Sequence, residues 1–227
     1  MVIGMVNRKG GCGKTTMAVN LAAALAERKR RVLVVHADPQ QSATRWAKQS
    51  NRQEGAGFCL GRDVYPLLPQ RNAAQFKTAL DKLRERHTAD TIIIDCPPEL
   101  TDPALMTALL ADLVLIPVTP SPLDIWAAEA ATQTVKEAKA QRDGQKPLAC
   151  LVPSKLQIGT VLAREIPDTL RRLGEPVAPG IAQRVAFIEA AVSGQTIDEY
   201  APESLGHQEF RQLARYVLQR EKELQGP

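Results

Sequence analysis

Short, almost wholly apolar runs alternate along this chain with longer segments in which apolar residues recur at helical spacing. Runs with few interspersed polar residues are typical of strands that are buried on both faces of a parallel sheet. We therefore predict strands at residues 2–6, 31–36, 91–95, 113–116 and 148–152.

The first segment between these runs favours a helix. Residues 17–25 are rich in helix formers and place Ala18, Leu21, Ala22 and Leu25 on one stripe, which would face a core.

Three later segments also read as helices: residues 73–86 and 125–141 cover the sheet, and residues 210–218 are amphipathic. Strands alternating with helices predict the α/β class, with a mostly parallel twisted sheet flanked by helices on both faces. Because no repeat, low-complexity tract or linker divides the sequence, we expect a single domain over residues 1–227.

A glycine-rich loop follows the first strand and opens the first helix. Glycines allow successive backbone N–H groups to point inward at an anion, and the helix N-terminus adds positive potential. Lys14 is placed to reach the terminal phosphates, and the Thr15 hydroxyl to hold magnesium. The loop predicts a nucleotide site of the P-loop NTPase kind, formed by Lys9, Gly10, Gly11, Cys12, Gly13, Lys14, Thr15 and Thr16.

The loop departs from the strict phosphate-loop pattern at its entrance. That pattern has glycine five positions before Gly13, where this chain has Arg8. A second lysine, Lys9, stands beside it.

Two acids follow predicted strands. Asp95 ends residues 91–95 and precedes Pro97 and Pro98, so it would lie at the carboxyl edge of the sheet and hold magnesium through a water. Asp38 follows residues 31–36 and could orient the water that attacks the terminal phosphate. Each acid could instead cap a helix, which for Asp38 would begin near Ser42.

The loop, read with Asp38-Pro39-Gln40, Asp95-Cys96-Pro97-Pro98 and the stretch from Ile181 to Ser204, resembles the ParA/MinD family of deviant Walker-type ATPases. The resemblance is greatest to the short ParA partition proteins and covers essentially the whole chain.

The resemblance implies ATP and Mg²⁺ as cofactors, and two ATP-bound protomers that meet face to face. Lys9 would cross to the partner's phosphates, Lys14 would bind its own protomer's phosphates, and Asp38 would position the attacking water. Thr15 and Asp95 would hold magnesium, and the stretch at Pro153 and Ser154 would lie near adenine. Many relatives have an acid two places before Asp38; here that residue is His36.

Charge alone does not identify a nucleic-acid binder, since the formal net charge is only +4. Non-specific DNA binding in the ATP state is implied by the family, with a basic surface formed across a dimer. The candidates are Lys155, Arg164, Arg171, Arg172, Arg184, Arg211 and Arg215. The run Arg28-Lys29-Arg30-Arg31 is better explained by its place at a helix C-terminus.

The resemblance further implies a ParB-like or other cargo-bound partner that stimulates hydrolysis, so that a plasmid, a chromosome origin or a protein assembly is positioned. We expect a cytoplasmic, nucleoid-associated protein without the extra sequence-specific DNA-binding domain that precedes some longer relatives. The four cysteines form no C-x-x-C pair, and we expect neither a signal peptide nor a membrane-spanning run.

Two alternatives remain. A MinD-like membrane ATPase is disfavoured because residues 219–224 are balanced in charge and do not form a basic tail. A metabolic kinase or ligase of the same superfamily would have no need for an intersubunit lysine.

Overall fold

Residues 1–37, 42–49, 64–66, 73–98, 102–142 and 144–225 are described by the computed structural model. Within them, one sheet has the strand order β3-β2-β4-β1-β5-β6, and every neighbouring pair is parallel. The strands are β1 (Val2–Met5), β2 (Val32–His36), β3 (Val64–Pro66), β4 (Thr91–Asp95), β5 (Leu113–Val118) and β6 (Leu148–Pro153). The α/β class and the parallel sheet are confirmed.

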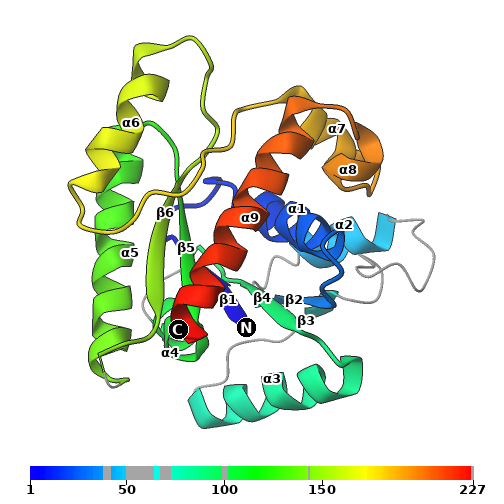
Figure 1. The fold of residues 1–227 in the computed structure, drawn as a ribbon, viewed down its shortest axis with the longest axis vertical. Helices are drawn as coiled ribbons and strands as arrows, with labels where there is room; N and C mark the ends of the chain where they lie inside the picture. Colours follow the sequence, from blue (N-terminus) through cyan, green and yellow to red (C-terminus); the bar gives the residue numbers. More distant parts are fainter. Residues whose placement is uncertain (38–41, 50–63, 67–72, 99–101, 143, 226–227) are drawn as a thin grey trace.

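Helices cover both faces of the sheet (Figure 1). One face carries α1 (Lys14–Ala26), α2 (Ser42–Gln49), α7 (Val185–Val192), α8 (Ile197–Tyr200) and α9 (Leu205–Gln225). The other carries α3 (Ala73–His87), α4 (Asp102–Leu110), α5 (Pro122–Ala140) and α6 (Val161–Arg171).

The strands alternate between the two cores, as the period of two requires. On β1, Ile3 and Met5 join the core under α1 and α9, whereas Val2 joins the core under α3. On β4, Ile93 faces the first core and Ile94 the second. Both faces of the central strands are therefore apolar, which explains their uninterrupted hydrophobic runs.

Helix α1 begins at Lys14, within the loop that was predicted to open it. It is buried almost all around from Met17 to Leu25, and not only along the predicted stripe. The reason is its central position, because the sheet, α2 and α9 enclose it on several sides.

Helix α9 packs along α1 through an apolar face. Phe210, Leu213, Ala214 and Val217 are buried in the shared core, and Figure 1 shows α9 crossing the outside of that layer. The amphipathic segment near the chain end is thus a packed helix. None of the described helices combines the length and apolarity needed to cross a bilayer.

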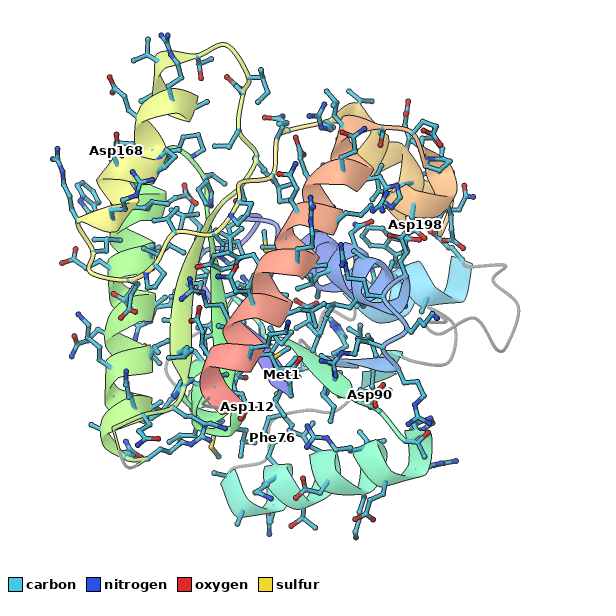
Figure 2. The ribbon with its side chains drawn as sticks, in the orientation of Figure 1. Met1, Phe76, Asp90, Asp112, Asp168 and Asp198 are labelled. Atoms are coloured by element: carbon cyan, nitrogen blue, oxygen red, sulfur yellow. The ribbon has the colours of Figure 1, made fainter. Side chains whose placement is uncertain are left out.

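The edge of the sheet that carries the strand N-termini is held by the start of the chain. The Met1 ammonium donates to the carbonyl of Asp90 over 2.8 Å, and the Val2 N–H donates to the Asp112 carboxylate over 2.8 Å. Figure 2 shows Met1 beside Asp112 and Asp90 at this edge. The predicted phosphate loop and Asp95 lie at the opposite edge, where the strands end.

Candidate nucleotide-binding site

The glycine-rich loop joins β1 to α1, as predicted. Gly13 is the residue before the helix and has a φ of 99°, and Gly11 has a φ of 77°. Side-chain-bearing residues rarely adopt these left-handed conformations, so the glycines are required for the loop to turn back over the helix N-terminus. The first N–H groups of α1 consequently face the loop.

A cleft of about 510 Å³ opens over this loop. The loop side is lined by Gly10, Gly11, Gly13, Lys14, Thr15 and Thr16, and the opposite side by Arg45, Trp46, Gln49, Pro98, Lys155 and Ala191. Six of the eight predicted loop residues therefore line one concave space, whereas Lys9 lines a second hollow. Arg45, Trp46 and Gln49 were not predicted, since nothing in the sequence of α2 marks them as site residues.

The ammonium of Lys14 lies inside the loop. It donates to the carbonyls of Asn7 and Lys9, each over 3.0 Å, and the residue is only 7% exposed. A buried ammonium held by backbone carbonyls of an anion-binding loop is suited to receive phosphate oxygens.

Thr15 and Asp95 meet at the edge of the cleft, although they are far apart in the sequence. The Thr15 hydroxyl donates to Oδ2 of Asp95 over 2.8 Å. The other carboxylate oxygen, Oδ1, is buried and has no hydrogen-bond partner among the described residues. A buried, unsatisfied carboxylate oxygen beside a hydroxyl fits a hydrated Mg²⁺, which prefers such ligands and keeps several waters.

His36 lies against the same carboxylate. Its Nδ1 is 3.2 Å from Oδ2 of Asp95, and its side chain is fully buried. The two residues are register partners at the ends of β2 and β4.

The second loop lysine points away from Lys14. The ammonium of Lys9 pairs with the Asp124 carboxylate in the first turn of α5, over 2.7 Å. Burial alone would raise the pKa of Asp124, but hydrogen bonds from Lys9, Thr119 and Ser121 outweigh it and hold that pKa below its ordinary value. Asp124 was missed because, as an acid at a helix start, it reads as a simple dipole partner.

The region proposed for adenine adjoins the loop through Ser154. Its hydroxyl donates to the carbonyl of Cys12 over 2.9 Å, and Pro153 is the last residue of β6. A mainly apolar cavity of about 280 Å³ continues from Thr16 and Ser154 towards Ile181, Phe187 and Phe210. Such a surface suits a flat aromatic base.

The Cys12 side chain is buried within the loop. Desolvation by burial raises the pKa of its thiol above the ordinary value, despite the nearby Lys14.

Asp38 lies outside the described residues. Helix α2 does begin at Ser42, where the alternative reading placed a helix start. The water-positioning role of Asp38 stays a prediction.

The DNA candidates are dispersed over the molecule. Arg184 pairs with Glu209 over 2.6 Å, and Lys155 lines the nucleotide cleft. The others lie on or next to α6 (Arg164, Arg171, Arg172) and on α9 (Arg211, Arg215). Their DNA-binding role stays a prediction.

The basic run at residues 28–31 follows α1, as expected. Backbone N–H groups of Arg28, Lys29 and Arg30 donate to carbonyls of the last turn of the helix. Arg30 also pairs with Glu221 of α9.

The parallel sheet, the loop between β1 and α1, and the Thr15–Asp95 pair together define a P-loop nucleotide-binding protein. Residues 3–197 match the family described as the CobQ/CobB/MinD/ParA nucleotide binding domain. The chain belongs to this family, and its relatives include ParA/MinD-type ATPases.

Two curated relatives span nearly the full chain. Maintenance of carboxysome distribution protein A of Halothiobacillus neapolitanus is 33% identical over 199 residues, covering 86% of this chain and 85% of the relative. The chromosome-partitioning ATPase Soj of Thermus thermophilus is 30% identical over 249 residues, covering 97% and 96%.

Among solved structures, the septum site-determining protein MinD of Pyrococcus horikoshii, complexed with Mg-ADP, superposes with a TM-score of 0.73 over 98% of each chain. At 20% sequence identity, this likeness shows the shared fold.

Proposed function

We propose that this protein is an ATP-dependent dimerisation switch that binds DNA non-specifically and positions a cargo. ATP would bring two protomers together face to face, and hydrolysis, stimulated by a cargo-bound partner, would release them. Full-length relatives named for carboxysome distribution and chromosome partitioning support this class of function.

The observation that carries the proposal is the division between the two loop lysines. Lys14 is buried within the loop, whereas the Lys9 side chain is 37% exposed, at the mouth of a second hollow of about 390 Å³. A cation held at the rim by one carboxylate is available to the phosphates of a second protomer.

Exposed apolar side chains lie on the elements around that rim. Leu123 and Trp126 on α5, Ile158 before α6 and Leu162 on α6 are each more than half exposed, at 61%, 63%, 73% and 61%. Leu162 lines the same hollow as Lys9. Large apolar groups beside a ligand site favour a covered state, and a second copy of the chain is the partner that the crossed lysine requires.

Within each protomer, Lys14 and the loop N–H groups would hold the phosphates, and Thr15 and Asp95 would hold Mg²⁺. An ion held by these two residues would supply positive charge that offsets the charge of the phosphates. We assign the water-positioning role to Asp38. The residues proposed for the DNA surface remain Lys155, Arg164, Arg171, Arg172, Arg184, Arg211 and Arg215.

The alternatives differ in what they require of Lys9 and α9. A metabolic kinase or ligase would act without DNA and without a crossed lysine. A membrane-bound ATPase would need an exposed apolar face on α9, but the apolar face of α9 packs on α1.

ATP turnover and mass in solution, each measured with ATP, with ADP and without nucleotide, test the proposal. We expect a dimer only with ATP, and DNA retention that accompanies the dimer and falls steeply with salt. A monomer in all three conditions, or retention independent of nucleotide, would contradict the switch. Turnover that requires a small-molecule acceptor would favour the metabolic alternative.

A further inference from the structure

His36 lies beside the carboxylate of Asp95, which would hold Mg²⁺ in the proposed site. It is the last residue of β2, and the parallel pairing of β2 with β4 sets it opposite Asp95. Both side chains are buried, at 0% and 1% exposed. The imidazole and the carboxylate therefore form one unit that is shielded from water.

The hydrogen bonding of this unit is asymmetric. Oδ2 of Asp95 lies 2.8 Å from the Thr15 hydroxyl, which donates to it, and 3.2 Å from Nδ1 of His36. An ionised carboxylate only accepts, so we assign Nδ1–H of His36 as the donor in this contact. Oδ1 of Asp95 and Nε2 of His36 are buried without partners among the described residues.

We propose that His36 is a positioning residue of the magnesium site. Its Nδ1–H fixes Oδ2 of Asp95 against Thr15 and leaves Oδ1 available for the hydrated ion. The inference deepens the proposed function, because it concerns how this chain holds Mg²⁺ for ATP.

Because residue 36 is a histidine, the site contains one buried carboxylate at this point, that of Asp95. An acid at position 36 would add a second. Two adjacent buried carboxylates repel one another and depend on a cation for compensation. An imidazole N–H compensates Asp95 directly, so the empty site stays ordered. Histidine in place of an acid at position 36 also lowers the negative charge that attracts Mg²⁺, and the affinity for the ion falls accordingly.

Three substitutions separate these effects. Asparagine places its amide nitrogen close to the position of Nδ1, so His36→Asn keeps the donor to Asp95. Glutamine carries its amide one methylene further along, near the position of Nε2, so His36→Gln is the matched control that lacks the donor. His36→Asp places a second carboxylate beside Asp95.

The first experiment is thermal unfolding of the full chain without nucleotide, in EDTA and in millimolar MgCl₂. We expect His36→Asn to melt close to the wild type in EDTA. His36→Asp should melt lower by about 4 °C or more, and MgCl₂ should restore part of the loss only in this variant. If His36→Asp is as stable in EDTA as the wild type, the compensating role of His36 is wrong.

The second experiment measures binding of a fluorescent ATP analogue over a series of Mg²⁺ concentrations. We expect the Mg²⁺ concentration for half-maximal binding to fall roughly tenfold in His36→Asp. It should change little in His36→Asn and rise in His36→Gln. Equal behaviour of the asparagine and glutamine variants would show that the Nδ1–H bond does not position Asp95.

The two proposals fail in different ways. A wild-type chain that binds no ATP analogue at any Mg²⁺ concentration would overturn the proposed function. The melting series in EDTA would still test the contact between His36 and Asp95.

Discussion

At the residue scale, the two lysines of the phosphate loop have different surroundings. Lys14 is enclosed by carbonyls of its own loop, and Lys9 reaches Asp124 at the rim. In the proposed switch, Lys14 would act on the phosphates of its own protomer and Lys9 on those of the partner protomer.

Lys14→Ala should abolish nucleotide binding, because it removes the only lysine ammonium that the described part of the chain places inside the loop. Titration calorimetry with ATP and Mg²⁺ would show a loss of at least about a hundredfold in affinity, or about 3 kcal/mol. Lys77→Ala on α3, which removes an exposed i,i+4 partner of Asp81, is the control and should bind normally. Tight ATP binding by Lys14→Ala would refute the loop assignment.

Lys9→Ala should retain most ATP affinity and lose partner- or DNA-stimulated turnover. The reason is that the Lys9 ammonium is held outside the loop by Asp124 and would act only across the dimer. Phosphate release assays with saturating ATP would show a drop in stimulated turnover of about a hundredfold or more. Stimulated hydrolysis at the wild-type rate would remove the case for a crossed lysine.

At the scale of elements, α2 packs against the turn between α7 and α8 and is hydrogen-bonded to it. The indole N–H of Trp46 donates to the carbonyl of Gln195 over 3.0 Å, and Gly194 lies against the backbone of Gln49 with a φ of 67°. Since α2 also lines the nucleotide cleft, this contact joins the cleft to α7.

Gly194→Ala should destabilise the fold, because a Cβ at this position would overlap the backbone of Gln49 as well as strain a left-handed residue. We expect a loss of about 3 kcal/mol in urea unfolding. Gly174→Ala is the matched control: its φ is 81°, and a Cβ there meets no atom within 4 Å. It should lose only about 1 kcal/mol. Equal losses in the two variants would show that the contact with α2 contributes nothing.

At the scale of the whole molecule, parallel pairing gathers the chemistry at one edge of the sheet. The loop after β1, His36 at the end of β2, Asp95 at the end of β4 and Ser154 after β6 all lie at the carboxyl ends of strands. In open α/β sheets, ligands bind at this edge. The hollow lined by Lys9 and the exposed Leu162 lies beside this edge.

Asp38→Ala should accumulate the ATP-bound dimer, since hydrolysis would be lost while both lysines remain. Light scattering with ATP would give a dimer that persists for hours, and salt-sensitive DNA retention should persist with it. A monomeric Asp38→Ala chain that turns over ATP normally would restrict Asp38 to capping α2. Wild-type protein, which should return to monomer as ATP is consumed, is the control.

Much of the site could be predicted because its elements are local. A phosphate loop needs a strand, glycines and a helix in sequence, and Lys14 and Thr15 are fixed within it by neighbouring backbone. Asp95 was found because a buried strand ends there. The partners of Lys9 and His36 were not predictable in the same way, since Asp124 and Asp95 lie 115 and 59 residues away.

Residues close together in the chain are enough to specify the alternation of strands and helices, the phosphate loop and the acids near strand ends. The tertiary structure decided the strand order β3-β2-β4-β1-β5-β6, and with it which side chains meet. Because that order is not the order along the chain, only folding brings His36 to Asp95, Lys9 to Asp124 and Ser154 to Cys12.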